Sequence, residues 1–356
     1  MPITVLVINP GSTSTKIAVY EDGEELFSEN VVHENEELSR FGTIAMQHEF
    51  REQHIRGALD RRGFSISRLS AVIGRGGLLK PIPSGVYRIG DTMKEDLSSA
   101  RFGEHASNLG ALIADDFGRE VGIPAFIADP VIVDELDDVA RVAGHKLFRR
   151  KSIFHALNQK AVARRWCREN GRAYENSTLI VAHMGGGVTV GLHRDGRVVD
   201  VNNGLDGEGP FSPERSGTLP AGDLVRLCFS GTHTEAEIRK MLTGRGGMVS
   251  LMGTNDLRAV EEAARIGDPE GSLYFKAFAY NVGKAIGALA AAAEGRVDAV
   301  ILTGGVAHSG LIVTLLQNMC KFIAPIAVYP GEGELEALAV AATRAVKGEC
   351  EIREYR

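Results

Sequence analysis

The pattern of apolar and polar positions repeats once along the chain, at an offset of 174 residues (178 − 4 = 174). In each copy an apolar strand, residues 4–9 or 178–184, enters a turn of small residues, and a second strand follows, residues 16–20 or 189–193. Each second strand leads to an Asp-Gly pair, which is a strong signal for a tight hairpin turn. Strand, turn, second strand and second turn agree together, so the sequence predicts two copies of one hairpin-led α/β domain.

The remainder of the chain alternates predicted strands with predicted helices. Short apolar runs predict strands at residues 71–74, 125–129, 297–302 and 326–329, and helical spacing predicts helices at 107–117, 152–166, 268–294, 309–322 and 334–346. Asp268-Pro269 supplies a cap and a first-turn proline for the long helix, and Ser309 caps the next one. Interleaved strands and helices predict α/β layers.

The length of 356 residues fits about two domains. We expect an N-terminal, acceptor-side α/β domain over residues 1–150 and a C-terminal, nucleotide-binding α/β domain over residues 151–333. The last segment, residues 334–356, is expected to fold back onto the first domain.

Composition narrows the possible functions. The formal net charge of −6 and the pI of about 6.0 give no reason to expect nucleic acid or an anionic membrane as partner. The first residues run into a strand without a signal-peptide pattern, and the alanine-rich run at 285–293 is too short for a membrane span. The 4 cysteines lie far apart without CxxC spacing, so neither a disulfide framework nor a zinc site is expected. These features favour a cytoplasmic enzyme.

Three glycine-rich turns follow predicted strands, at residues 9–16, 183–187 and 303–309. Such turns present backbone N–H groups to phosphates, although a tight hairpin also needs glycine for its own geometry. The GxxxxGK[ST], complete GxGxxG and HExxH patterns are absent from the sequence. Three turns in a duplicated framework therefore favour a nucleotide site other than a P-loop or a dinucleotide fold.

The turn at residues 9–16, Asn-Pro-Gly-Ser-Thr-Ser-Thr-Lys, resembles the first signature of the acetate and butyrate kinases, within the actin, Hsp70 and sugar-kinase superfamily. The resemblance continues in order through residues 74–77, 104–108, 127–130, 152–156, 181–187, 215–217, 303–305 and 332–334. The wording of the motifs is closer to the butyrate kinases of that family. The resemblance implies an α/β fold of two duplicated ribonuclease-H-like (actin-type) ATPase domains around a central cleft.

The resemblance also implies a reaction. It is that of a phosphotransferase that moves the γ-phosphoryl group of Mg-ATP reversibly, by direct in-line transfer, onto butyrate or a related short- or branched-chain acid, giving an acyl phosphate. The implied cofactors are ATP or ADP and Mg²⁺, the implied assembly is a homodimer or a higher homo-oligomer, and no nucleic acid or membrane partner is expected. Alternatives are an acetate or propionate kinase, a sugar-type kinase with Asp129 as base, and a non-catalytic ATP-driven chaperone or scaffold.

Site residues carry over from the resemblance position by position. Arg75 and Arg215 would neutralise charge on the transferring phosphoryl group, and His155 would donate to one of its equatorial oxygens. Asp129 is also assigned a catalytic role. Because His155 lies on a predicted helix, it has a plainer interpretation as a capping or packing residue.

Further residues carry over as ligand contacts. Those expected to hold the nucleotide are Asn9, Ser12, Ser14, Lys16, His183, Gly185, Gly186, Gly187, Gly304 and Gly305. Asn9 and Glu334 are expected to hold Mg²⁺, with Glu332 and Glu336 as alternatives to Glu334. Arg75, His105 and Asn108 are assigned to the acceptor, the last two with a plainer interpretation as a structural pair. The chain departs from the acetate kinases at Gly186, where those enzymes carry asparagine.

Overall fold

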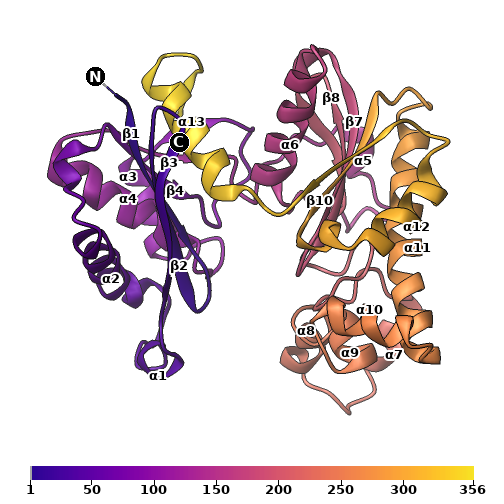
Figure 1. Ribbon diagram of the computed structural model, residues 1–356. Coiled ribbons are helices and arrows are strands. Elements are labelled where there is room, and N and C mark those ends of the chain that lie inside the picture. The colour runs from indigo at the N-terminus through magenta and orange to yellow at the C-terminus, as the bar shows by residue number, and fades with distance from the viewer. Residues whose placement is uncertain (1) are drawn as a thin grey trace. The chain divides into compact units, whose positions relative to one another are not determined.

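The computed structural model describes residues 2–356, and the contacts within it divide the chain into two compact units (Figure 1). Unit 1 comprises the residues up to Val133 together with Gly333–Arg356, and unit 2 comprises Asp134–Glu332. The chain thus passes into unit 2 ahead of the boundary expected near residue 150. Glu135 is responsible in part, because its carboxylate pairs with the buried Lys160 of unit 2 at 2.7 Å.

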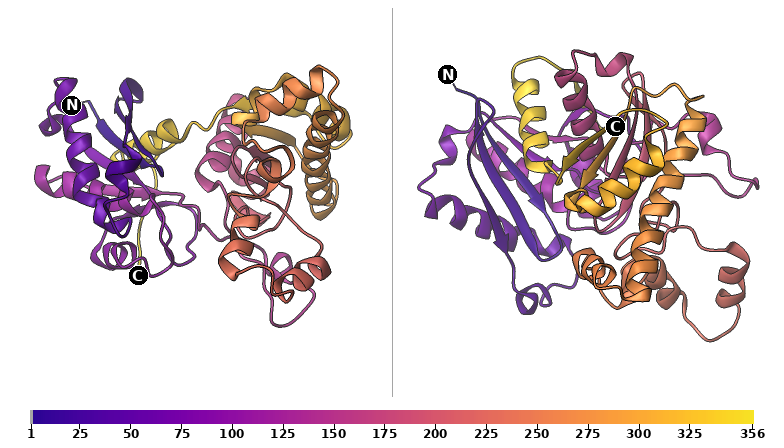
Figure 2. Two further views of the ribbon diagram at one scale, coloured as in Figure 1. Left: turned by 90° about the horizontal axis from the view of Figure 1, so that it is seen from below. Right: turned by 45° about the vertical axis from the view of Figure 1, so that its right-hand side comes forward.

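Unit 1 contains a 7-stranded sheet in the order β12-β5-β6-β4-β1-β2-β3. Its strands are β1 (Thr4–Pro10), β2 (Ser14–Glu21), β3 (Glu24–Val32), β4 (Ala71–Arg75), β5 (Val86–Arg88), β6 (Ala125–Ala128) and β12 (Ile352–Glu354). Its helices are α1 (Asn35–Leu38), α2 (His48–Arg61), α3 (Asp91–Ser98), α4 (Asn108–Val121) and α13 (Glu334–Val346), with 3₁₀ turns η1 (Ala45–Gln47) and η2 (Ile66–Arg68). In Figure 2 the yellow helix α13 lies against one face of this sheet, and α4 packs against the other.

Unit 2 contains a 5-stranded sheet in the order β11-β10-β7-β8-β9. Its strands are β7 (Thr178–Met184), β8 (Val188–Arg194), β9 (Arg197–Val201), β10 (Ala299–Gly304) and β11 (Ile326–Pro330). Its helices are α5 (Asp138–Arg141), α6 (Ala156–Glu169), α7 (Ala221–Cys228), α8 (Glu235–Leu242), α9 (Gly247–Met252), α10 (Leu257–Arg265), α11 (Pro269–Ala292) and α12 (Gly310–Cys320), with 3₁₀ turns η3 (Tyr174–Asn176) and η4 (Gly305–His308).

The two sheets share one topology, which confirms the predicted duplication. The order β3-β2-β1-β4-β6 in unit 1 matches β9-β8-β7-β10-β11 in unit 2, with an antiparallel meander on one side and parallel strands on the other. Both hairpins turn at the predicted Asp-Gly pairs, where Asp22 and Asp195 each have a φ of 51°. Each hairpin also has a register shift at the same place, Val19/Tyr20 in one and Leu192/His193 in the other.

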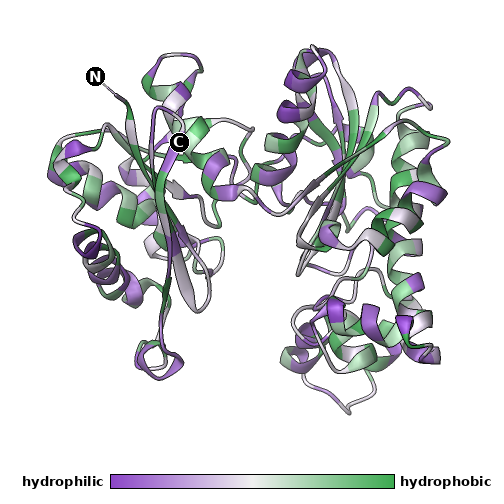
Figure 3. Cartoon of the chain, viewed as in Figure 1, coloured by the Kyte–Doolittle hydropathy of each residue, from purple (hydrophilic) through white to green (hydrophobic). Residues whose placement is uncertain are grey.

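Alternating side chains bury both faces of each central strand. In unit 2 the residues Ile180 and Ala182 of β7 join the core beneath α11 and α12, whereas Leu179 and Val181 join the core beneath α6. In unit 1 the corresponding residues of β1 are fully buried between α4 on one face and α13 on the other. Figure 3 shows the contrast between the mostly hydrophilic α2 at the surface and the mostly hydrophobic, alanine-rich α11.

Most predicted elements appear within a few residues of their expected ends. Asp268 caps α11 by accepting from the Gly271 N–H, and α13 spans the predicted residues 334–346. Helix α6, however, begins at Ala156 rather than at residue 152, which leaves His155 at the N-cap position. Within the described residues, no helix combines the length and the apolar character that a membrane crossing requires.

Candidate active site

A buried arginine holds the first glycine-rich turn in unit 1. Arg51 of α2 is 1% exposed, and its guanidinium donates to the carbonyl oxygens of Gly11 (2.8 Å), Ser12 (2.9 Å) and Ser14 (3.2 Å). The Gly11 N–H closes the turn onto the Ser14 carbonyl at 2.7 Å. Burial lowers the pKa of Arg51 to about 10, so the side chain is still a cation at neutral pH. No sequence motif singled this residue out.

The inward carbonyls fix the direction of the N–H groups in this turn. The peptide bonds of this turn are trans, and in a trans peptide the N–H points opposite to the C=O. The N–H groups of Ser12 and Thr13 therefore point away from Arg51, as they do in concave anion-binding turns. Ser12 and Lys16 are exposed and Ser14 is half-buried. Their predicted contact with phosphate fits this geometry and stays a prediction.

Asn9, Arg75 and Glu334 meet at the ends of β1 and β4 and the start of α13. The amide nitrogen of Asn9 donates to Glu334 Oε2 at 2.7 Å, and Arg75 Nη1 lies 3.1 Å from the same oxygen. Arg75 Nη1 also donates to Asn9 Oδ1 at 3.3 Å. Glu336 lies in the same first turn of α13, but Glu334 is the glutamate that joins the other two residues.

Asp129 follows β6 in an unusual backbone conformation, with a φ of 40°. Its carboxylate oxygen Oδ1 accepts from Ser84 Oγ at 2.5 Å and from the Gly85 N–H at 2.9 Å. Donors of this kind favour the ionised form of a carboxylate. A non-glycine residue held at positive φ by its surroundings is common at functional sites. The local structure therefore holds the Asp129 carboxylate in one orientation.

His105 and Asn108 have different surroundings. His105 is exposed, and its Nδ1 accepts from the Ser107 N–H at 3.1 Å. Asn108 is 3% exposed, and its side chain accepts from the Leu78 N–H at 2.9 Å and donates to the Gly103 carbonyl at 3.0 Å. Both ends of the Asn108 amide are thus bonded to backbone, which supports the plainer interpretation that it shapes the neighbouring loops.

In unit 2, His155 and His183 stack against each other, with ring centroids 3.8 Å apart and an interplanar angle of 10°. His183 is buried near the end of β7, and its Nδ1 lies 2.7 Å from Asn158 Oδ1. An amide oxygen only accepts, so His183 donates from Nδ1. His155 Nδ1 lies 2.9 Å from the hydroxyl of Thr189 on β8. Helix α6 and the β7–β8 hairpin therefore position both rings.

Arg215 and His155 converge on Gly187. A Cβ atom built on Gly187 would lie 2.2 Å from Arg215 Nη1 and 3.3 Å from His155 Cε1, so a larger residue would displace the Arg215 guanidinium. Arg215 Nη1 donates to the Gly204 carbonyl at 2.6 Å. Burial lowers the pKa of Arg215, which nonetheless remains a cation because a guanidinium starts so far above neutral pH. Unit 2 thus brings together Arg215, His155, His183 and Gly187.

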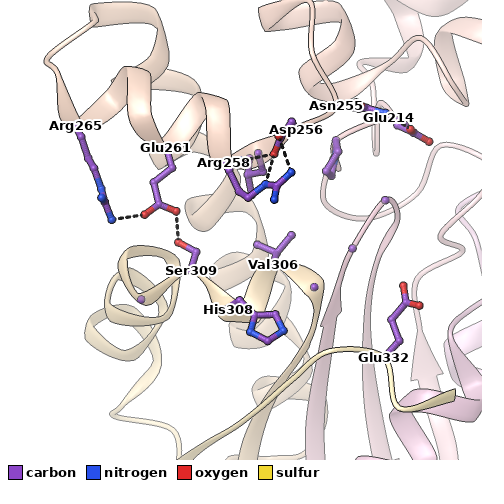
Figure 4. A pocket seen from close by; sticks show the side chains of 16 residues that line it. Glu214, Asn255, Asp256, Arg258, Glu261, Arg265, Val306, His308, Ser309 and Glu332 are labelled. Atoms are coloured by element: carbon purple, nitrogen blue, oxygen red, sulfur yellow. Dashed lines mark hydrogen bonds and ion pairs between the residues drawn. The ribbon is translucent and has the colours of Figure 1, made fainter. Parts of the chain in front are cut away.

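A cavity of about 900 Å³ opens beside the second and third glycine-rich turns (Figure 4). This volume is within the range of small-molecule sites. Its lining residues all belong to unit 2: Gly185, Gly186, Pro213, Glu214, Asn255, Asp256, Leu257, Arg258, Glu261, Arg265, Gly305, Val306, His308, Ser309, Gly310 and Glu332. Three of them, Gly185, Gly186 and Gly305, are glycines expected to contact nucleotide.

Two helices begin at this cavity. Asp256 caps α10 by accepting from the Arg258 N–H at 3.0 Å, and Ser309 caps α12 by accepting from the Ile312 N–H at 3.2 Å. Helix N-termini carry partial positive charge, which favours anionic groups. Glu261 links the two helices through a 2.7 Å hydrogen bond from Ser309. The sequence motifs missed the α10 side of the cavity, although Asp256 before an apolar helical pattern does signal a helix start.

Gly304 has a structural requirement of its own. Its φ is 87°, and a Cβ at this position would lie 2.3 Å from the Met184 carbonyl oxygen. The backbone of Gly304 also exchanges hydrogen bonds with Gly331, at 3.1 and 3.0 Å. The close approach of β10 to β7 therefore explains this glycine, and the adjacent Gly305 lines the cavity.

The residues present fit the groups that the resemblance implies. Asn9 Oδ1 and the carboxylates of Asp129 and Glu334 are hard oxygen donors of the kind that Mg²⁺ prefers. The glycine-rich turns and the helix N-termini at the cavity suit phosphates, and the cavity has room for a nucleoside.

Known proteins resemble this chain along its whole length. The model of the acetokinase family matches residues 138–324. A probable butyrate kinase of Clostridium botulinum (strain Alaska E43) is 53% identical over 355 residues, covering 100% of both chains, and butyrate kinase 1 of Clostridium acetobutylicum is 51% identical over 352 residues, covering 99% of both. Among solved structures, Porphyromonas gingivalis acetate kinase superposes with a TM-score of 0.78 at 21% identity, covering 96% of this chain and 99% of that one.

The duplicated sheets give the chain a two-domain α/β architecture with the actin-like fold, which the acetate kinase structure shares. The chain belongs to the acetokinase family of carboxylate kinases.

Proposed function

We propose that this enzyme transfers the γ-phosphoryl group of Mg-ATP reversibly to butyrate or a related short- or branched-chain acid. The observation that carries the proposal is the 51–53% identity to butyrate kinases over nearly the full length of both chains. By contrast, the acetate and propionate kinases of known structure are 15–21% identical and support the fold alone.

The chemistry requires cations more than it requires a base. A carboxylic acid has a pKa of about 4 to 5 and is already an anionic nucleophile at neutral pH. The obstacle is the repulsion between this anion and the phosphates of ATP. In our proposal Arg215 and Arg75 offset that repulsion at the transferring group, and the ring of His155 donates to an equatorial oxygen. Arginine suits this role because its planar fork donates two bonds and stays charged.

The remaining residues hold the reactants. We assign the phosphates to the turns at residues 9–16 and 183–187, and the adenosine to the cavity beside Gly305. Asn9, Asp129 and Glu334 would hold Mg²⁺, partly through water. When bound, the ion supplies positive charge at the terminal phosphates.

Acetate and propionate are expected as slower acceptors rather than as excluded ones. A pocket discriminates by only about 1 to 3 kcal/mol per methylene, which corresponds to factors of about 10 to 200. A sugar-type reaction requires Asp129 to act as a base. The donors from Ser84 and Gly85 already occupy one of its oxygens, which suits the organisation of a metal ion better than the uptake of a proton.

Hydroxamate trapping tests the proposal. The purified enzyme is incubated with ATP, Mg²⁺, hydroxylamine and unbranched or branched acids of two to six carbons, with glucose and glycerol as hydroxyl controls that are followed by ADP release. We expect the highest kcat/KM for a four-carbon acid or its branched neighbours. No hydroxamate from any acid would reject the proposal, and a maximum at acetate would assign the acceptor to the alternative. Size-exclusion chromatography with light scattering tests the expected homo-oligomer.

A further inference from the structure

Five polar side chains form a continuous hydrogen-bonded chain inside unit 2 that ends at His155. It runs from Tyr174 Oη to His193 Nδ1 (2.8 Å), from His193 Nε2 to Gln159 Oε1 (3.1 Å), from Gln159 Nε2 to Thr189 Oγ1 (2.8 Å) and from Thr189 Oγ1 to His155 Nδ1 (2.9 Å). Gln159, Thr189 and His193 are each 0% exposed. A polar network this deeply buried is costly unless every member is satisfied.

The face of β8 next to α6 leaves room for these hydrogen-bonded side chains. Thr189, Gly191 and His193 alternate along β8, so they share the sheet face that α6 covers. A Cβ at Gly191 would lie 2.5 Å from Gln159 Oε1, so glycine is needed for the glutamine to enter. The arrangement is therefore specific to these residues and is not a chance contact of polar groups.

The positions of the protons along this hydrogen-bonded chain follow from the orientation of the Gln159 amide. Gln159 Nε2 also donates to the backbone carbonyl of Thr189 at 3.0 Å, which fixes the amide with its nitrogen toward Thr189 and its oxygen toward His193. His193 must then donate from Nε2. Its pKa lies well below the ordinary value because the ring is fully buried and the cations Lys160 and Arg164 are near. His193 is therefore neutral, and its Nδ1 accepts from the Tyr174 hydroxyl.

The same reasoning determines which ring nitrogen of His155 carries the proton. The Thr189 hydroxyl already accepts from Gln159, and His155 Nδ1 lies within hydrogen-bonding reach of its single proton. If His155 carried its proton on Nδ1, the buried Thr189 hydroxyl proton would lose this acceptor. We infer that the chain Tyr174–His193–Gln159–Thr189 holds neutral His155 in the form protonated at Nε2, so that its N–H is the donor presented to the transferring phosphoryl group. This inference rests on the proposed function for the identity of the acceptor oxygen.

Gln159, Thr189 and His193 are thus positioning residues that act through His155. Their contribution resembles that of partners that fix the tautomer of a catalytic or metal-binding histidine elsewhere. A purely structural role would stabilise the fold without setting where the His155 proton lies.

The test is ring-¹⁵N NMR of the whole protein labelled in histidine, with the His155 signals assigned by their loss in His155→Gln. In the wild type at neutral pH, we expect Nδ1 of His155 to be unprotonated and Nε2 to carry the proton. Thr189→Val, which removes the hydroxyl at nearly constant size, should abolish this preference and lower kcat about tenfold, with KM values for ATP and acid little changed. Thr189→Ser, which keeps the hydroxyl, should restore the tautomer and most of the rate.

A wild-type spectrum with the proton on Nδ1 would overturn the inference, even if Thr189→Val failed to fold. A Thr189→Val variant that folds and keeps both the wild-type tautomer and the wild-type kcat would also overturn it. The spectrum is recorded without substrate, so failure of the hydroxamate assay leaves the tautomer result standing. An active butyrate kinase with the other tautomer would reject this inference alone.

Discussion

Arg75 and Glu334, which are 259 residues apart in the sequence, form a 3.1 Å ion pair within unit 1. The arginine ends β4 and the glutamate begins α13, so the last long helix of the chain supplies part of the site on the first sheet. The Glu334 side chain is 9% exposed, and that of Arg75 is 23% exposed. Arg75 therefore has a structural partner in addition to its proposed role toward the phosphoryl group.

This double role makes Arg75→Ala costly in two ways. We expect kcat to fall on the order of 10³-fold, by analogy with other arginines at transferring phosphoryl groups. We also expect the free energy of unfolding to fall by about 1–3 kcal/mol, because the buried Glu334 carboxylate loses its cation. Steady-state kinetics and urea denaturation measure the two effects.

Arg75→Lys is the matched control. It keeps the charge beside Glu334 and should recover most of the stability, but it lacks the planar fork and should remain slow. Wild-type kcat in purified Arg75→Ala would contradict the catalytic assignment.

Gly187→Ala should disable the site without unfolding the protein. Its added Cβ would lie 2.2 Å from Arg215 Nη1, so the guanidinium must move from its position beside His155. We expect a loss of kcat on the order of 10²-fold, since small misplacements of reacting groups have effects of this size. The neighbouring Gly186→Ala adds its methyl group in open space and should be wild-type in stability. An equal kcat for wild type and Gly187→Ala would show that catalysis does not require the Arg215 guanidinium beside His155.

The Arg51 side chain is expected to be essential for the first phosphate turn. Arg51→Met leaves the carbonyls of Gly11, Ser12 and Ser14 without their donor, so the free energy of unfolding should fall by about 3 kcal/mol. The KM for ATP should rise, because the N–H groups of the turn lose their fixed direction. Arg61→Ala, on the exposed side of the same helix, should change stability by less than about 0.5 kcal/mol. Similar denaturation curves for the two variants would contradict this account.

His33 should make the protein less stable as the pH falls. Burial, with the nearby charges of Arg51 and His54, lowers the pKa of His33 from 6.5 to about 4. As pH drops through this interval the unfolded chain binds a proton that the folded chain does not, so stability is lost between about pH 6.5 and pH 4. The loss should total about 3 kcal/mol, because each pKa unit corresponds to about 1.4 kcal/mol.

The pH dependence of unfolding in wild type and His33→Gln measures this effect. The variant should lose part of the slope, and the buried His193, whose pKa is also lowered, should account for some of the remainder. Identical slopes in the two proteins would rule out His33 as a source.

The sequence predicted most strands, turns and helix starts correctly, because the signals for them lie within a few neighbouring residues. Apolar strands, Asp-Gly turns and the caps Asp268 and Ser309 each act over a few residues, and the structure confirms them. The start of α6 was predicted too early, because the polar spacing of residues 152–155 resembles helix while the chain there is irregular and ends with His155 as cap.

The supporting residues of the site were harder to predict. Arg51 reaches its turn across 37 to 40 residues of sequence, and Gln159 reaches Thr189 across 30. A charged residue on a helix is usually solvated, so neither its burial nor its partners can be read from spacing. The cavity wall at Asn255–Arg258 was equally hard to predict, since its position depends on how α10 packs against α11.

A crystal structure of the enzyme with Mg-ADP, aluminium fluoride and butyrate would test the central claim most directly, because aluminium fluoride mimics the phosphoryl group in transfer. The account predicts that the guanidinium groups of Arg75 and Arg215 and the Nε2–H of His155 lie within hydrogen-bonding distance of the fluorine atoms. It also predicts that a butyrate carboxylate oxygen, the aluminium and the terminal ADP oxygen lie on one line. Guanidinium groups directed away from the fluorides in that complex would contradict it.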